Sequence, residues 1–96
     1  MIASFGDRAT EELFHGIQSR YSRKLPNQIH EMALYKLDLL NAAQVLDDLR
    51  SPPGNRLESL RGDLEGFHSI RINAQWRVIF RWVGNSAHDV QIVDYH

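Results

Sequence analysis

The spacing of apolar residues changes at residues 51–56, SPPGNR, and this change constrains the fold more than any other feature of the chain. Before it, apolar residues recur every three or four positions, as in an amphipathic helix; after it they alternate, as in β-strands. Two prolines and a glycine end the helical part at that point. The later segments are joined by short connections, which require antiparallel neighbours. The sequence therefore predicts an α+β fold, with helices packed on one face of a sheet.

The first half of the chain predicts two helices. Asp7 is a candidate N-cap for a helix over residues 8–20. Pro26 excludes helix just before it, and Asn27 is a candidate N-cap for a second helix over residues 28–49. A coiled-coil seam is an alternative use of the second helix, but packing against a core suits its short pattern better. Its predicted buried stripe is Met32, Tyr35, Leu39, Ala42, Leu46 and Leu49, widened by Ile29, Ala33, Leu37 and Leu40.

The second half predicts four strands, over residues 57–60, 67–72, 76–82 and 89–94. Glycine-containing segments separate several of them and have the chemistry of tight turns. Residues 2–5 form a further possible edge strand. Together these elements predict one domain over residues 1–96, with an N-terminal strand and two helices packed on a sheet of about four to five strands.

Composition excludes several classes of protein. The chain has no stretch long and apolar enough to span a membrane and no secretion signal at its start, which favours the cytoplasm. It has no cysteine, so disulfides and thiolate metal sites are excluded. No histidine or carboxylate pair has the close spacing typical of a metal site, so neither a metal nor another cofactor is expected.

Arginines gather on one predicted face of the sheet. If Trp76, Val78, Phe80 and Trp82 face the helices, Arg77 and Arg81 face away from them, and Arg71 joins them from the preceding strand. All six basic residues between positions 50 and 81 are arginines, whose planar guanidinium binds phosphate in a two-pronged way. A phosphate-binding surface is one interpretation; an ordinary solvated face is the other.

The chain ends with a carboxylate, a phenol and an imidazole, at Asp94, Tyr95 and His96. Cleavage of RNA without a metal needs a base for the ribose 2′-OH, a cation for the phosphorus transition state and an acid for the departing 5′-oxygen. His96, Arg77, Asp94 and Glu58 supply such a set. An idle terminal histidine is the alternative. Of the other histidines, His15 and His30 are predicted to be surface or satisfied residues on helices, and His68 a hydrogen-bonded residue at the edge of the core.

Several motifs together resemble a HigB-type toxin of the RelE/ParE superfamily of bacterial toxin–antitoxin systems. They are L-x-G-D-x-x-G, S-I-R-I-N, Q-W-R and the terminal D-Y-H, and the resemblance covers the whole chain. It implies a RelE-like α+β fold and an endoribonuclease that cleaves mRNA in the decoding site of the ribosome, without a metal or cofactor. It also implies a helix-turn-helix antitoxin of the HigA type as partner, with operator DNA bound only through the toxin–antitoxin complex.

The same resemblance assigns roles to residues. The family's terminal catalytic set falls on Asp94, Tyr95 and His96, its arginine after the tryptophan on Arg77, and its basic residue before Gly-Asp on Arg61. Some members have a histidine where this chain has Glu58, which then either acts as the base or orients His96 or Arg77. Tyr95 either stacks on a nucleobase or points into the core. The arginines expected to bind RNA are Arg56, Arg61, Arg71 and Arg81.

Two other functions compete with the ribonuclease. One is a non-catalytic RelE-fold protein that acts only by binding its antitoxin with the operator, or by binding the ribosome. The other is a gyrase inhibitor of the ParE kind, against which the terminal histidine argues, because gyrase inhibition needs no proton shuttle.

Overall fold

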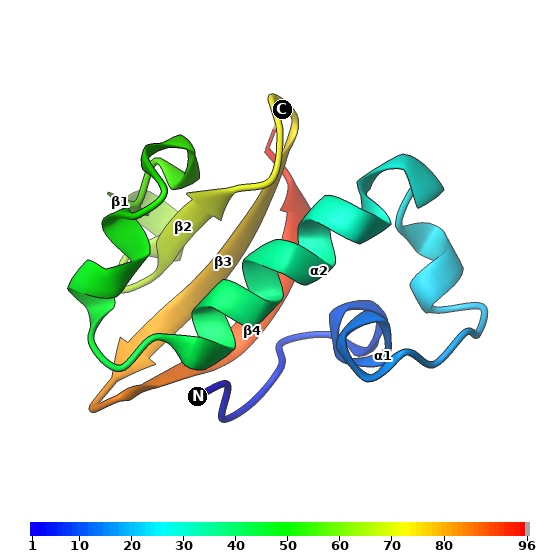
Figure 1. Ribbon diagram of the computed structural model, residues 1–96, viewed down its shortest axis with the longest axis horizontal. Helices are drawn as coiled ribbons and strands as arrows, with labels where there is room; N and C mark the ends of the chain where they lie inside the picture. The colour runs from blue at the N-terminus through cyan, green and yellow to red at the C-terminus, as the bar shows by residue number, and fades with distance from the viewer. Residues whose placement is uncertain (96) are drawn as a thin grey trace.

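Two helices cover one face of a four-stranded sheet in the computed structural model, which describes residues 1–95 (Figure 1). This arrangement confirms the predicted α+β fold. Short 3₁₀ turns at Ser22–Lys24, Leu46–Arg50, Pro53–Asn55 and Gly62–Leu64 fill the connections. The regular elements are α1 (Arg8–His15), α2 (Asn27–Ala42), β1 (Glu58–Ser59), β2 (His68–Arg71), β3 (Trp76–Val83) and β4 (Ser86–Asp94).

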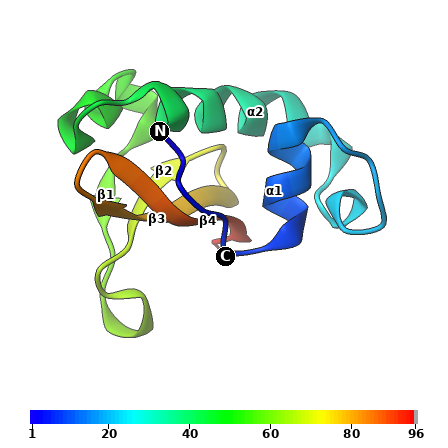
Figure 2. The same cartoon turned by 90° about the horizontal axis from the view of Figure 1, so that it is seen from below.

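The strands pair in their order along the chain, β1-β2-β3-β4, and all pairs are antiparallel. The N-terminal segment runs along the free edge of β4 (Figure 2). It is not a full strand as expected, but makes two isolated parallel bridges, Ile2 with Ala87 and Phe5 with Val90. Amides and carbonyls of residues 1–6 thereby satisfy the β4 edge, for example through the Gly6 N–H, which donates to the Val90 carbonyl at 2.8 Å.

The first helix begins where its sequence predicts and ends earlier. The Thr10 N–H donates to Asp7 Oδ1 at 2.9 Å, which confirms Asp7 as the N-cap. Gly16 adopts a left-handed conformation, with φ of 72°, and its N–H and that of Ile17 bond carbonyls of the last turn. The helix therefore ends at His15 and not at residue 20.

The second helix differs from its prediction at both ends. Asn27 is its first residue and gives no side-chain cap, so its assignment as N-cap is wrong. The helix ends at Ala42, since Ala43 is extended, and not at residue 49. The Asp48 carboxylate accepts bonds from the amides of Gln44 and Val45, which starts a separate 3₁₀ turn in place of further α-helix.

The buried face of α2 is narrower than predicted. Ile29, Ala33, Leu37 and Leu40 are almost fully buried, while Met32 and Tyr35 are each 46% exposed. The apolar residues of α2 thus lie on two sides of the helix, and only one side packs on the sheet. The core joins this side to residues of α1 and of three strands, including Leu13, Ile70, Val78, Phe80, Val90 and Ile92.

A buried polar contact ties α2 to the loop before β1. The Lys36 ammonium donates to Asn55 Oδ1, and Asn55 Nδ2 donates to the carbonyls of Leu49 and Ser51. Burial lowers the pKa of Lys36 below its ordinary value. The contact fixes the loop from which β1 enters the sheet. Within residues 1–95, no helix combines the length and the apolar character needed to cross a membrane.

Candidate functional site on the open face of the sheet

The face of the sheet turned away from α2, here called the open face, carries the predicted arginines. Ile70, Val78 and Ile92 belong to the core, so residues that alternate with them point to the other side. The register aligns Arg71 with Arg77 and Val93, and one row further Glu58 with Ser69, Ile79 and Gln91. The alternation predicted for β3 is therefore confirmed. Ile79 lies on the open face as predicted, but its side chain is covered there and only 2% exposed.

Arg77 is held on two sides. Its Nη1 donates to the Asn73 carbonyl at 2.8 Å, and its Cζ lies 5.0 Å from the centroid of the Tyr95 ring. Both contacts leave guanidinium N–H groups available, because the ring uses the face of the cation and the carbonyl uses one nitrogen. A half-buried, preoriented guanidinium of this kind can bind one phosphate in a two-pronged way.

Arg71 and Arg77 are directly paired across β2 and β3. Like charges opposite one another weaken an antiparallel pair. Within residues 1–95, neither guanidinium has a carboxylate within ion-pair distance. An anion placed between the two side chains would remove this repulsion, so the pair is suited to a phosphodiester.

Arg81 lies on the same face but is occupied differently. Its Nε is 3.4 Å from an Asp89 carboxylate oxygen, and its Cζ lies 4.4 Å from the centroid of the Phe67 ring. A Cβ at Gly66 would come within 3.2 Å of Arg81 Nη1. Arg81 thus joins β3 to the β1–β2 hairpin, and its exposed ion pair is worth only about 0–1 kcal/mol, which an RNA phosphate can displace.

Ser69 contributes a buried hydroxyl between Glu58 and Ile79. Its side chain is 1% exposed, and its Oγ has no hydrogen-bond partner within residues 1–95. Glu58 itself is exposed at the start of β1. The open face therefore offers a carboxylate and the Arg71–Arg77 pair in adjacent rows.

The end of β4 places Asp94 and Tyr95 on opposite faces of the sheet. Tyr95 is 41% exposed and lies beside Arg77, so it does not point into the core. Asp94 is aligned with Trp76, which puts its side chain on the opposite face, where Gln75 Nε2 donates to it at 2.9 Å. The Tyr95 N–H donates to the Gln75 carbonyl at 2.6 Å. His96 lies outside the described residues.

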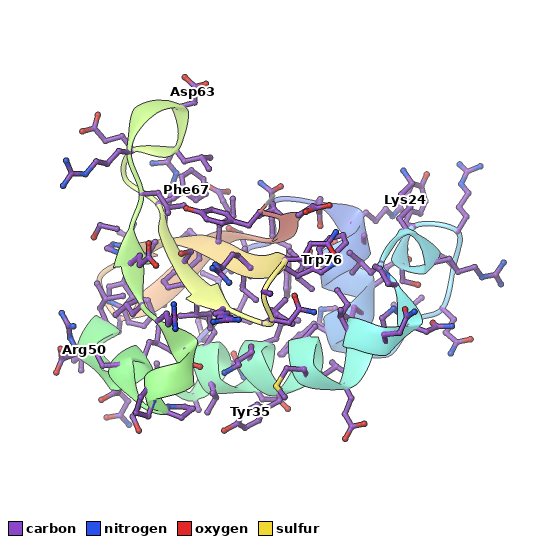
Figure 3. All side chains as sticks on the ribbon, turned by 90° about the horizontal axis from the view of Figure 1, so that it is seen from above. Lys24, Tyr35, Arg50, Asp63, Phe67 and Trp76 are labelled. Atoms are coloured by element: carbon purple, nitrogen blue, oxygen red, sulfur yellow. The ribbon has the colours of Figure 1, made fainter. Side chains whose placement is uncertain are left out.

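Arg61 and Arg56 flank the short strand β1 and are exposed. Arg61 precedes the turn of the β1–β2 hairpin and lines a pocket of about 390 Å³ with Phe67 and His68. Arg56 adopts a left-handed conformation, with φ of 47°, at the end of the preceding 3₁₀ turn. Figure 3 shows the hairpin, with Asp63 at its tip and Phe67 at its base, projecting on the side of the sheet away from α2.

A β-bulge brings His88 onto the open face. The register shifts between Ile79 and Arg81, and Asp89 takes a φ of 53°. Ala87 and Val90 both remain in the core, so two residues lie between them in place of one, and His88 is aligned with Arg81. Simple alternation of apolar residues does not predict this bulge. The sequence indicates it only through Asp89, because aspartate tolerates the left-handed region better than most residues.

The other histidines agree with their predictions. His68 Nδ1 is 3.3 Å from Ser59 Oγ, its ring stacks on Phe80, and burial lowers its pKa. His30 Nε2 donates to the Leu25 carbonyl at 2.8 Å, and His15 packs on the edges of Phe5 and Phe14. In the part of the chain that the structure describes, no three His, Asp or Glu residues form a group that could hold a metal ion.

The architecture is that of RelE-fold toxins. The structure matches a mutant form of YafQ from E. coli with a TM-score of 0.64 at 11% sequence identity, over 98% of this chain and 93% of that one. It matches a YoeB/ParE toxin from Agrobacterium tumefaciens with a TM-score of 0.52 at 18% identity, over 100% and 99% of the two chains. These likenesses establish the fold.

The sequence comparisons identify the family. Residues 3–96 match the family described as the RelE-like toxin of type II toxin–antitoxin system HigB. Toxin HigB-1 of Vibrio cholerae is 42% identical over 87 residues, 91% of this chain and 90% of that protein. Endoribonuclease HigB of Proteus vulgaris is 29% identical over the full length of both chains. The chain thus belongs to the HigB family of type II toxins, which confirms the expected resemblance and implies an antitoxin partner.

Proposed function

We propose that this toxin is a metal-independent endoribonuclease that cuts mRNA in the decoding site of the ribosome and so stops translation. The observation that carries the proposal is the Arg71–Arg77 pair on the open face, with the Tyr95 ring against Arg77. The relative from Proteus vulgaris, which is named an endoribonuclease, supports it.

In the proposed reaction, the ribose 2′-oxygen attacks the adjacent phosphorus and the bond from phosphorus to the 5′-oxygen breaks. A base takes the 2′-OH proton, and an acid gives a proton to the departing 5′-oxygen. The products are a 2′,3′-cyclic phosphate and a 5′-hydroxyl. Two negative charges gather on the non-bridging oxygens in the transition state, and Arg77 and Arg71 stabilise them.

Glu58 and His96 are the proposed proton carriers. Glu58 lies on the open face, one row from Arg71, where it can act as the base or orient another group. His96 follows Tyr95 and is the proposed acid. Asp94 and Gln75 fix the end of β4, and through it they position Tyr95.

The remaining arginines are proposed to hold the RNA backbone. Arg61 and Arg56 flank β1, and Arg81 lies beside Phe67, whose ring could stack on a base once Arg81 turns to a phosphate. Such local charge suffices for an enzyme whose RNA is already held by the ribosome, which agrees with the net charge of −1.

The proposed partners are a helix-turn-helix antitoxin of the HigA type and the ribosome with its mRNA. Operator DNA would be bound only through the toxin–antitoxin complex. The proposed compartment is the cytoplasm, where translating ribosomes are found.

Purified toxin added to translating ribosomes, followed by mapping of mRNA 5′-ends, tests the proposal. We expect cuts within the decoded codon, with 2′,3′-cyclic phosphate on the upstream fragment and no cuts on free mRNA. His96→Ala should abolish both cleavage and growth arrest. Growth arrest without cleavage would instead support the non-catalytic binding protein, and inhibition of DNA supercoiling would support the ParE-like activity.

A further inference from the structure

A cluster of cations surrounds Tyr21 at the end of the molecule formed by α1 and the 3₁₀ turn Ser22–Lys24. The Cζ atoms of Arg8 and Arg20 lie 4.9 and 5.0 Å from the Tyr21 ring centroid, and Lys24 Nζ lies 5.8 Å from it. Arg20 Nη2 also donates to the Tyr21 hydroxyl at 3.0 Å. We call Arg8, Arg20, Tyr21 and Lys24 the Tyr21 cluster.

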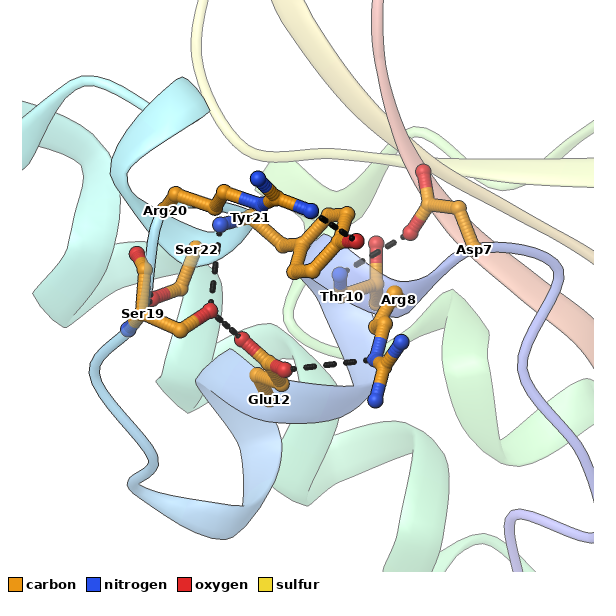
Figure 4. A network of polar contacts seen from close by, with 8 residues as sticks. All are labelled: Asp7, Arg8, Thr10, Glu12, Ser19, Arg20, Tyr21 and Ser22. Atoms are coloured by element: carbon orange, nitrogen blue, oxygen red, sulfur yellow. Dashed lines mark hydrogen bonds and ion pairs between the residues drawn. The ribbon is translucent and has the colours of Figure 1, made fainter.

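The cluster is held in place by a buried carboxylate (Figure 4). Glu12 is 9% exposed; one of its oxygens accepts from Ser19 Oγ and the other lies 3.5 Å from Arg8 Nε. Ser19 Oγ in turn accepts from the Tyr21 N–H at 3.0 Å. Because this network fixes the backbone that carries the cluster, less conformational entropy is lost when a ligand binds there.

The positive charge of the cluster is only partly compensated. Only Arg8 forms an ion pair, with Glu12; in the described part of the chain, Arg20 and Lys24 have no carboxylate within 4.0 Å. The other acidic groups of α1 are Asp7, which caps the helix, and the exposed Glu11. Charged residues stacked on a ring, with free N–H donors, are the groups that bind phosphates and stack on unpaired bases.

The segment that leads into the cluster crosses the β4 border of the open face. A Cβ at Gly6 would lie 2.5 Å from Gln91 Cγ, so the chain passes directly over the Gln91 side chain, and Arg8 follows two residues later. Gln91 is aligned with Ile79 on the open face. In Figure 3, Lys24 and Phe67 both lie on the side of the molecule away from Tyr35 of α2, with Trp76 between them.

We propose that the Tyr21 cluster binds the phosphate backbone of the substrate RNA strand, several nucleotides away from the phosphodiester held by Arg77. This rests on the proposed ribonuclease function and extends it to a second contact with the same strand. A protein partner fits the cluster less well, since protein interfaces are built around an apolar centre. The exposed apolar residues Met32 and Tyr35 lie on α2 instead.

Binding of non-cleavable single-stranded oligonucleotides of about 4 and about 16 nucleotides tests the proposal, because single strands occupy sites of about that range of lengths. We compare the wild type with Arg20→Gln/Lys24→Gln, and use Arg50→Gln as a control. Arg50 is exposed beside Asp47, on the α2 side of the molecule. The readout is affinity as a function of salt, which does not depend on cleavage.

The double variant should bind the long oligonucleotide roughly tenfold more weakly at low salt, and its salt slope should fall by about 1.4, since each lost phosphate contact on a single strand removes about 0.7. Its affinity for the short oligonucleotide should not change, and Arg50→Gln should match the wild type for both lengths. Equal affinity of the wild type for both lengths would overturn the proposal. The proposal would also be overturned if the double variant bound both oligonucleotides like the wild type and lost only its binding to the ribosome or to the antitoxin. Loss of cleavage in Arg77→Ala, with the long oligonucleotide still bound more tightly than the short one, would separate this contact from the proposed catalytic function.

Discussion

The guanidinium of Arg77 lies against the ring of Tyr95, with its Cζ 5.0 Å from the ring centroid. The contact joins the start of β3 to the end of β4, and it holds the cation at the end of the sheet where the terminal residues emerge. The phenol hydroxyl takes no part in this contact. We therefore expect the proposed cleavage to depend on the Tyr95 ring and not on the acid–base chemistry of its hydroxyl.

Tyr95→Phe should therefore retain cleavage close to the wild-type rate, while Tyr95→Ala loses it. A cation–π contact at an exposed site is worth about 0.5–1 kcal/mol and stacking on a base about 1–3 kcal/mol, so kcat/KM of the alanine variant should fall roughly 10- to 1,000-fold. Ribosome-dependent cleavage of a defined mRNA measures this. If the phenylalanine variant is as poor as the alanine variant, the hydroxyl takes part in the chemistry.

Arg77→Lys should be nearly inactive although the charge is kept. Lysine has neither the planar fork for two phosphate oxygens nor a flat face for the Tyr95 ring. Loss of a preorganised donor to the transition state costs of order 10²–10³ in rate, which single-turnover cleavage on the ribosome would measure. Arg50→Lys, which changes an exposed arginine paired with Asp47, serves as the control and should cut normally. Similar rates for the two variants would remove Arg77 from the proposed mechanism.

Ser69→Ala should stabilise the fold. The buried Ser69 hydroxyl has no partner in residues 1–95, and a buried unsatisfied group of this kind costs about 1–3 kcal/mol. We expect the free energy of unfolding in urea to rise by about 1 kcal/mol, while Ser59→Ala, which removes the exposed contact with His68 Nδ1, should lower it by about 0.5 kcal/mol. A large destabilisation by Ser69→Ala would mean that the hydroxyl makes a bond in solution.

His68→Gln should flatten the dependence of stability on pH. Burial lowers the pKa of His68 below its ordinary value of about 6.5, so below that pH the unfolded chain binds more protons there than the folded one. Its contribution to stability is complete above about pH 6.5 and is lost as pH falls toward the folded pKa. Urea unfolding of the wild type and of His68→Gln measures this between about pH 7 and pH 5. The free energy of unfolding should fall less in the variant than in the wild type as the pH is lowered. Parallel curves would rule out this linkage.

Hydrophobic spacing predicts the layers of this fold well, because the alternation of β3 is set by burial of Val78 and Phe80. It fails on α2, where Met32 and Tyr35 continue an apolar pattern that the sheet does not cover. Spacing cannot show which of two apolar sides meets the core, since that depends on how the helix lies on the sheet.

The site shows the same division. Alternation places Arg71, Arg77 and Arg81 together on one face, and also separates Tyr95 from Asp94. It does not place His88, because the bulge at Asp89 depends on a backbone conformation and not on a hydrophobic pattern. Nor does it reveal that Arg81 is already paired with Asp89.

The bridges made by residues 1–6 have a consequence for how copies of this toxin meet. They cover the β4 edge of the sheet, and the strand at the opposite edge, β1, has only two residues. The sheets of two molecules therefore have almost no free edge strand through which to pair edge to edge. Crowding or release from the antitoxin should then leave the toxin dispersed, without fibrils. An inhibitor that worked by adding a strand would have to dock beside Glu58, next to the open face itself.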